Sequence, residues 1–325
     1  MSRVMIIHTG GTLGMRGEPL EPTEFSTDLH ESLPELETFA EVEACVACNL
    51  DSSDVGPREW KEIVRIIGVE RERFDGFVIV HGTDTMAYSA SALAFALNGL
   101  DRPVIFSGAQ RPLAERRSDA KRNLIDAVEL ATRDIPEVGI CLDGLLLRGC
   151  RATKSSNRLY RAFESPGCEP LATLGVDVAL SSSIRRPNTL FFADGRFEAG
   201  VVVVFVTPGM DPDVMRCMMQ SPAIKGLVLL TFGLGTAPNR EKAFGPVVRE
   251  AVDRGVDVLV ISQALGNVDL ARYVNSRALH TAGAINGGLM LPEAAVTKLM
   301  HALAVYPDAE DRRRYLMWNV AGELG

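Results

Sequence analysis

The sequence has no long basic run and no long apolar run, and each absence excludes a class of partner. It carries 34 Lys and Arg against 42 Asp and Glu, which gives a formal net charge of −8. No run of Lys or Arg is long enough to follow a phosphate backbone, so nucleic acid is not an expected partner. The longest apolar stretch, residues 200–206, is far shorter than the roughly 20 residues that span a bilayer. We therefore expect no membrane partner either.

The sequence is also poor in secretory and metal-binding signals. One basic residue, Arg3, precedes an apolar run of only Val4–Ile7, which is too short for the core of a signal peptide. The six cysteines and five histidines include one ligand-like spacing, Cys45 with Cys48, and no second pair completes a metal set. We expect a cytoplasmic protein with reduced thiols and without a metal.

What the sequence does contain is a regular alternation of strand-like and helical patterns. This alternation predicts βα units and a largely parallel sheet. At 325 residues the chain is too long for one ordinary core, so two domains are expected. The pattern fails between about residues 181 and 199, which are rich in Ser, Arg, Pro and Asn. We predict an N-terminal domain over residues 1–182, a linker over 183–199 and a C-terminal domain over 200–325.

The individual elements follow from hydrophobic periodicity. The expected strands are Val4–Ile7, Ala44–Ala47, Phe77–Val80, Val104–Phe106, Val201–Val206, Leu227–Leu230 and Val256–Ile261. The expected helices are Pro57–Val69, Tyr88–Leu97, one capped by Ser118 or Asp119 and ending near Ala131, Val214–Gln220, Glu241–Arg254 and Pro292–Ala304.

Two turns marked by glycine follow apolar strands and present threonine hydroxyls. The first reads HTGGT at residues 8–12, and the second reads HGTDT at residues 81–85. In an open α/β sheet, ligands bind outside the carboxyl ends of the strands. The two hydroxyls are therefore expected to face one crevice. Neither a P-loop nor a GxGxxG pattern follows any strand, so the glycines do not indicate a phosphate cradle.

Each signal also has a purely structural interpretation. A Gly-Gly-Thr turn suits any strand–loop junction. Thr83, Asp84 or Thr85 can cap the helix that follows, although a hydroxyl beside a carboxylate can also hold an ammonium group and a polarised water. Lys154 is either a solvated surface lysine or a group that activates a threonine hydroxyl. Spacing alone does not separate these alternatives.

Taken together and in order, the motifs resemble those of bacterial-type L-asparaginases, and in particular the cytoplasmic type I group. The resemblance runs from residue 4 to about residue 305. It implies two α/β domains with largely parallel sheets, a larger N-terminal domain that carries the catalytic threonines and a smaller C-terminal domain. The segments that carry it are 9–15 (TGGTLGM), 51–54 (DSSD), 81–86 (HGTDTM), 148–154 (RGCRATK), 208–210 (PGM), 232–238 (FGLGTAP), 287–288 (GG) and 293–295 (EAA).

The resemblance implies an amidohydrolase that converts L-asparagine and water to L-aspartate and ammonia through a threonine acyl-enzyme. Thr12 would be the nucleophile, and Thr83, Lys154 and Asp84 would form the supporting set. The group that takes the proton from Thr12 is left open. No metal or organic cofactor is required. Backbone N–H groups near Thr12 or Thr83 would stabilise the oxyanion.

The same resemblance implies how a small zwitterionic substrate is held. Asp84 would bind the α-ammonium group, and Ser52 with neighbouring backbone would bind the α-carboxylate. The expected substrate-binding residues are Gly11, Asp51, Ser52, Ser53, Thr83 and Asp84.

Two features of the family are missing from this sequence. Family members commonly place a tyrosine on the loop after the first turn, whereas Arg16–His30 contains none and Leu20 lies near the expected place. The second asparagine site of some type I enzymes needs a cysteine near residues 262–264 and an arginine near residue 231. Ala264 and Thr231 do not supply these groups, so we expect no allosteric asparagine site.

Family members are dimers or tetramers, which implies a homodimer or homotetramer with Asn267 and Glu293 near a neighbour's site. Three alternatives stay open. A glutaminase-asparaginase differs by one methylene of substrate, worth about 1–3 kcal/mol of discrimination. An amidotransferase subunit that releases ammonia for a tRNA-linked reaction usually has an additional N-terminal domain, whereas the pattern here starts at residue 4. A non-catalytic amino-acid sensor is disfavoured because all four proposed catalytic residues are present.

Overall fold

The computed structural model describes residues 1–16, 21–22 and 33–325 of the chain. They form two compact units, Met1–Gly195 (unit 1) and Arg196–Gly325 (unit 2). The break between the units falls inside the 183–199 stretch that the sequence predicts as a linker. The part of that stretch before the break contacts unit 1: the Arg148 guanidinium donates to the Ser183 carbonyl at 2.8 Å, and the Arg185 N–H donates to Glu137 at 2.7 Å.

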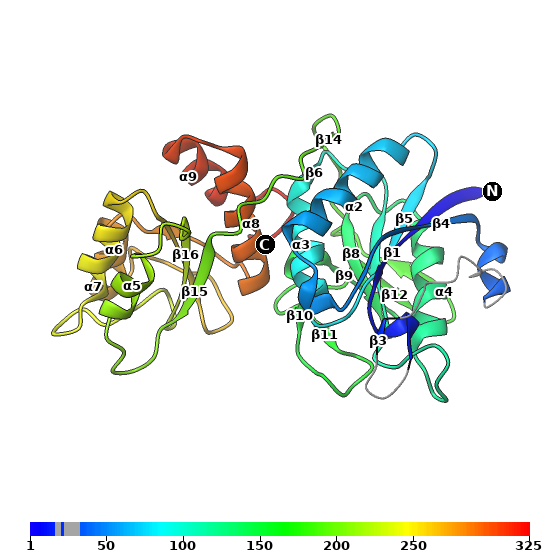
Figure 1. The fold of residues 1–325 in the computed structure, drawn as a ribbon, viewed down its shortest axis with the longest axis horizontal. Helices are drawn as coiled ribbons and strands as arrows, with labels where there is room; N and C mark the ends of the chain where they lie inside the picture. Colours follow the sequence, from blue (N-terminus) through cyan, green and yellow to red (C-terminus); the bar gives the residue numbers. More distant parts are fainter. Residues whose placement is uncertain (17–20, 23–32) are drawn as a thin grey trace. The chain divides into compact units, whose positions relative to one another are not determined.

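Unit 1 is built on a mixed eight-stranded sheet (Figure 1). In spatial order its strands are β13 (Val178–Leu180), β12 (Ala172–Leu174), β9 (Leu145–Arg148), β8 (Val138–Leu142), β7 (Val104–Ser107), β5 (Gly76–Val80), β1 (Ser2–Gly10) and β4 (Ala40–Leu50). The five strands from β8 to β4 are parallel, and β9, β12 and β13 extend the sheet with antiparallel pairing. The centre of the sheet is therefore the parallel part.

Three helices connect the parallel strands, namely α2 (Pro57–Glu70), α3 (Met86–Ala96) and α4 (Ala120–Ala131). Helices α2 and α3 lie on one face of the sheet and α4 lies on the other (Figure 1). On the α4 face, Val4 and Ile6 of β1 and Val78 of β5 pack in one buried cluster with Leu124 and Val128 of α4. Because β1 and β5 are covered on both faces, their residues are apolar without alternation.

Short elements complete unit 1. They are the 3₁₀ helices η1 (Thr12–Gly14), η2 (Pro34–Thr38), η3 (Ser52–Asp54) and η4 (Gly149–Arg151), and the two-residue strand pairs β2 (Met15–Arg16) with β3 (Glu21–Pro22), β6 (Leu97–Asn98) with β14 (Phe192–Ala193), and β10 (Thr153–Lys154) with β11 (Phe163–Glu164).

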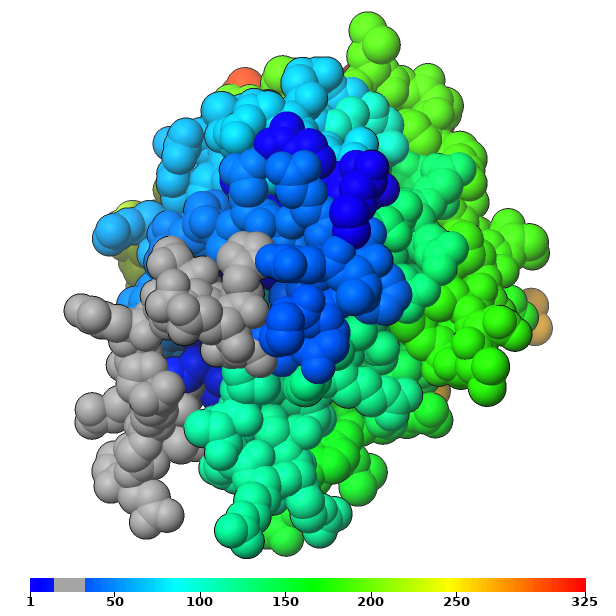
Figure 2. Space-filling view, turned by 90° about the vertical axis from the view of Figure 1, so that its right-hand side faces the viewer, coloured from blue at the N-terminus to red at the C-terminus, as the bar shows by residue number. Residues whose placement is uncertain are grey.

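Strand β4 forms one edge of the described sheet. Figure 2 looks onto this side of unit 1, where segment 33–50 (blue) lies beside the N-terminal residues (dark blue). Glu43 of β4 forms ion pairs with Arg3 at 2.6 Å and with Arg73 at 3.2 Å. Charged side chains along an edge strand discourage pairing with another chain.

Unit 2 is a smaller α/β unit with a four-stranded parallel sheet. Its strands are β15 (Val201–Phe205), β16 (Gly226–Thr231), β17 (Asp257–Ser262) and β18 (Ile285–Asn286), and its helices are α5 (Asp213–Met218), α6 (Phe244–Asp253), α7 (Val274–Thr281), α8 (Pro292–Val305) and α9 (Ala309–Met317). In α8, Lys298 is fully buried and donates to Glu323 at 2.5 Å and to the carbonyls of Leu316 and Trp318. This ammonium group ties the last residues of the chain to the helix.

The predicted fold class is confirmed: two α/β units with largely parallel sheets, the larger of them N-terminal. Strands β8, β9, β12, β13 and β18 were not predicted, because runs of two to five residues carry little periodicity. Helices α7 and α9 were also missed. None of the helices in the described ranges is long and apolar enough to cross a membrane.

Candidate active site

The candidate site lies where four neighbouring parallel strands end. The parallel strands lie side by side in the order β4, β1, β5, β7, β8. If they are numbered by their order in the chain, this is 2-1-3-4-5, so the direction of winding reverses between β1 and β5. Open α/β sheets bind ligands at the carboxyl ends of the strands on either side of such a reversal. Thr12 follows β1 and Thr83 follows β5. The topology therefore places the two threonine turns at the expected ligand crevice.

Three of the turns at this edge are in direct contact through glycine. A Cβ added to Gly11 would lie 2.3 Å from the Gly82 nitrogen, and one added to Gly82 would lie 2.8 Å from Ser52 Oγ. Gly11 also has φ = +87°, a conformation that L side chains rarely adopt. Only glycine lets the Thr12, Thr83 and Ser52 turns approach this closely.

Lys154, Thr83 and Asp84 form one hydrogen-bonded set. The Lys154 ammonium donates to Thr83 Oγ1 at 2.7 Å and to Asp84 Oδ1 at 2.5 Å. The Lys154 side chain is 16% exposed, whereas that of Asp84 is 71% exposed. Lys154 is therefore not the solvated surface lysine of the structural interpretation. It is a largely buried cation that orders a hydroxyl and a carboxylate at the edge of the crevice.

The hydroxyls of the second turn do not serve mainly to cap α3. Thr85 is the N-cap residue, yet its side chain makes no capping hydrogen bond. Its Oγ1 donates instead to the Ser52 carbonyl at 2.5 Å. Thr85 thus ties the Ser52 turn to the start of α3, a role that its place in the HGTDT motif did not reveal.

Gln110, on the loop after β7, was not predicted as a site residue. Thr83 Oγ1 donates to Gln110 Oε1 over 3.5 Å, while Gln110 Nε2 donates to two backbone carbonyls of the 156–159 loop. The Asp119 carboxylate accepts from the Gln110 backbone N–H at 3.1 Å and from Asn123 Nδ2 at 3.0 Å. The Asp119 side chain therefore holds the Gln110 loop. Although Asp119 is the N-cap residue of α4, its side chain makes no capping hydrogen bond to that helix. The signal available from sequence was the polar segment 107–112, which follows the expected strand Val104–Phe106.

The Asp51–Ser53 turn is held by its own side chains. The Asp51 carboxylate accepts from the Ser53 N–H at 2.8 Å and from the Ser53 hydroxyl at 2.7 Å. These bonds lower the pKa of the Asp51 carboxyl. Ser52 is buried against the Gly82 turn, whereas Asp51 and Ser53 are exposed. Of the three, Ser52 is the residue in contact with the second threonine turn.

The remaining predicted residues have mixed placements. Thr12 is the first residue of η1 and half-buried, and the carbonyl of the next residue, Leu13, accepts from the Leu113 N–H at 3.1 Å. Leu20 lies outside the described residues. Asn267 is exposed and Glu293 is buried, both in unit 2, and their place beside a neighbour's site stays a prediction.

The positions of the absent regulatory site also belong to unit 2. Thr231 is fully buried at the end of β16, where its Oγ1 donates to the Ile261 carbonyl at 3.0 Å. Ala264 is exposed in the loop after β17. The absence of allosteric regulation stays a prediction.

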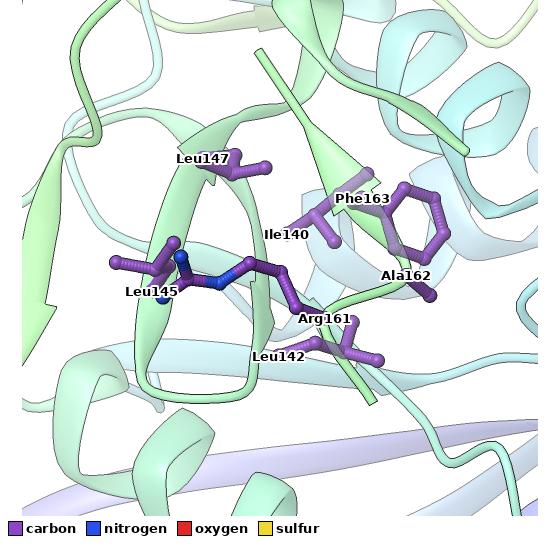
Figure 3. Close-up of a pocket in the computed structure, with 7 residues that line it drawn as sticks. All are labelled: Ile140, Leu142, Leu145, Leu147, Arg161, Ala162 and Phe163. Atoms are coloured by element: carbon purple, nitrogen blue, oxygen red, sulfur yellow. The ribbon is translucent and has the colours of Figure 1, made fainter. Parts of the chain in front are cut away.

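The two cavities described in unit 1 contain none of the predicted site residues. The smaller lies beside β8 and β9, is lined by apolar side chains and the stem of Arg161, and has a volume of about 10 Å³, the lower limit for one water (Figure 3). The larger, about 410 Å³, lies between β4 and α2 and is lined by opposite charges, among them Arg58 and Glu62.

The described residues also contain no group of three His, Cys, Asp or Glu side chains suited to a metal ion. Cys45 and Cys48 lie on strand β4, where the Cys48 thiol donates to the Thr9 carbonyl at 3.3 Å. Both thiols are free, and burial raises the pKa of Cys48 to about 11.

Comparison with known proteins gives matches along most of the chain. Residues 3–186 match the family model described as "Asparaginase, N-terminal", and residues 200–316 match "Glutaminase/Asparaginase C-terminal domain". The chain is 38% identical to L-asparaginase 1 of Escherichia coli (strain K12), with 99% of this chain and 97% of the relative covered.

Two further matches bear on function. A glutamyl-tRNA(Gln) amidotransferase subunit of Pyrococcus horikoshii is 33% identical, with 99% of this chain and 76% of the relative covered. The crystal structure of L-asparaginase I from Vibrio cholerae O1 biovar eltor superposes with a TM-score of 0.91 at 34% identity, covering 100% of this chain and 99% of that one. These relatives are similar to the chain over nearly its whole length, yet they are named for different activities.

Proposed function

The chain belongs to the asparaginase family, and on this premise we propose that it hydrolyses L-asparagine to L-aspartate and ammonia. The observation that carries the proposal is the Lys154 ammonium, which holds both Thr83 and Asp84 at the edge where β1 and β5 end. A catalytic threonine pair with a buried cation and a carboxylate fits an amidohydrolase better than it fits a plain binding module.

The reaction proceeds in two steps. Thr12 Oγ1 attacks the side-chain amide carbon of the substrate, a C–O bond forms, and the C–N bond breaks as the nitrogen takes up a proton and leaves as ammonia. A water molecule then attacks the resulting β-aspartyl ester, releases L-aspartate and restores the Thr12 hydroxyl. Lys154 and Thr83 orient that water and stabilise negative charge as it develops.

The two ends of the substrate meet different turns. Asp84, exposed at the crevice, binds the α-ammonium group through the carboxylate oxygen that Lys154 does not engage. Ser52, with Gly11 and the Asp51–Ser53 turn, binds the α-carboxylate. Fixing both charged ends places the amide carbon near the nucleophile, and such positioning supplies several kcal/mol of the barrier.

The oxyanion that forms on the amide oxygen is stabilised by a backbone donor. The described residues contain no hydrogen-bond partner for the Thr83 N–H. A preorganised N–H of this kind, aimed at developing charge, is worth about 10²–10³ in kcat. We assign the Thr83 N–H to this role.

We further propose a cytoplasmic homodimer or homotetramer without allosteric control, in which Asn267 and Glu293 approach a neighbour's site.

One alternative is supported by a specific finding. The match to an amidotransferase subunit covers 99% of this chain, so ammonia release for a partner enzyme is the second candidate. The test is a side-by-side measurement of kcat/KM for free asparagine and free glutamine with the purified protein. The proposal requires asparagine to be the better substrate. A preference for glutamine would favour a glutaminase, and inactivity toward both free amides would favour the amidotransferase.

A further inference from the structure

A chain of three hydrogen bonds runs from helix α2 through helix α3 to the second threonine turn. Trp60 Nε1 lies 2.8 Å from Ser89 Oγ, Ser89 Oγ lies 2.8 Å from His81 Nε2, and His81 Nδ1 lies 2.7 Å from the Gly82 carbonyl oxygen. Ser89 is fully buried, and Trp60 and His81 are nearly so. The imidazole also packs against Phe106, with ring centroids 5.7 Å apart.

Chemistry allows only one direction for the protons in this chain. An indole N–H only donates and a carbonyl oxygen only accepts. The His81 Nδ1 must therefore carry a proton for Gly82, and Ser89 Oγ must accept from Trp60. Burial lowers the pKa of His81 to about 4, so the ring is neutral near pH 7 and its Nε2 is a bare acceptor. The Ser89 hydroxyl donates to that nitrogen, and every group in the chain is satisfied.

The Gly82 carbonyl is the last acceptor in this series of hydrogen bonds, and its position sets the orientation of the Gly82–Thr83 peptide. In a trans peptide the N–H points opposite to the preceding carbonyl. A Gly82 carbonyl held toward the buried imidazole therefore directs the Thr83 N–H away from it. This N–H is the one assigned above to the oxyanion. Gly82 has no side chain to fix the peptide, and its contacts with Gly11 and Ser52 leave no room for one.

We propose that Trp60, Ser89 and His81 are positioning residues for the reaction, because together they hold the Gly82–Thr83 peptide with its N–H toward the substrate amide oxygen. The inference rests on the proposed function for its catalytic consequence, and on the hydrogen-bond chain alone for its geometry. None of the three residues touches the substrate. Their contribution is made through the Thr83 N–H, and it matters most in the transition state, when the oxyanion forms.

A pair of serine variants on the same helix tests the proposal. Ser89→Ala removes the middle of the chain, whereas Ser91→Ala removes an equally buried hydroxyl that donates to the Gly149 carbonyl at 3.3 Å instead. We expect Ser89→Ala to lower kcat for asparagine by about tenfold or more with less than about a threefold change in KM, since a misplaced donor weakens the transition state more than the ground state. Ser91→Ala should keep kcat within about twofold of wild type. Equal kcat values for the two variants would overturn the proposal.

Histidine variants keep the test independent of overall folding. His81→Asn places an amide N–H near the position of Nδ1, so it should retain more of kcat than His81→Leu, which has no donor. If the Leu variant does not fold, the serine pair still decides. Retention of full kcat by a folded His81→Leu would contradict the positioning role.

The geometry is tested separately by ¹⁵N NMR of the histidine rings in the unliganded protein, which reports the tautomer without any substrate. The proposal predicts a neutral ring with the proton on Nδ1 for His81. A proton on Nε2 would overturn the chain of donors whatever the substrate is. The predicted tautomer in a protein that does not hydrolyse asparagine would instead reject the proposed function and leave the hydrogen-bond chain standing.

Discussion

Replacement of Lys154 should reduce catalytic activity far more than it reduces the stability of the fold. Replacement of Lys154 by Met keeps the length of the side chain but removes the donor to Thr83 at 2.7 Å and to Asp84 at 2.5 Å. Because Asp84 is 71% exposed, solvent screens this ion pair and its loss should cost at most about 1 kcal/mol of unfolding free energy. The loss in activity should be far larger.

The expected decrease in kcat is about 10²–10⁴-fold, the range typical of a lost acid–base or electrostatic group in an active site. Ammonia release at saturating asparagine measures kcat, and urea unfolding measures stability. Lys121→Met is a matched control, since Lys121 also forms a short lysine–carboxylate ion pair, with Glu35 at 2.6 Å, and is not one of the predicted site residues. A Lys154→Met protein that keeps more than about one third of wild-type kcat would refute the role given to Lys154.

Two further predictions concern stability. Lys298→Met leaves the fully buried Glu323 carboxylate without its cation, which should cost about 3–5 kcal/mol of unfolding free energy in urea melts, and a cost below about 1 kcal/mol would contradict the buried pair. His8 and His81 both have a pKa lowered from 6.5 to about 4 by burial. As pH falls, these histidines therefore take up protons in the unfolded chain before they do so in the folded protein. The free energy of unfolding should be greatest above about pH 6.5 and decrease toward pH 4, by about 3 kcal/mol for each histidine. Urea melts at pH 7 and pH 5 measure this decrease, and equal stability at both pH values would contradict the neutral buried rings.

Much of the fold follows from local sequence signals. The apolar runs that end in the two threonine turns are the central strands β1 and β5, and Pro57 marks the first residue of α2 as expected. The antiparallel strands β12 and β13 are only three residues long, and their pairing depends on neighbours distant in sequence. Local periodicity does not contain that information.

The site was predictable to a similar extent. The motifs named Thr83, Asp84 and Lys154, and the structure brings these three together. Gln110 and Ser89 act through hydrogen bonds across 27 and 8 residues of sequence, and single residues of these types give no signal by themselves. Their roles depend on which elements are neighbours in space, and only the assembled fold defines that.

The central claim is that Thr12 attacks the substrate, and one comparison tests it most directly. Wild-type protein and Thr12→Ala are assayed for ammonia release from L-asparagine under the same conditions, with circular dichroism to establish that both are folded. The account predicts hydrolysis by the wild type and a decrease in kcat of at least about 10³-fold in the variant, as expected when a nucleophile is removed. Hydrolysis at equal rates by the two proteins would contradict the assignment of Thr12.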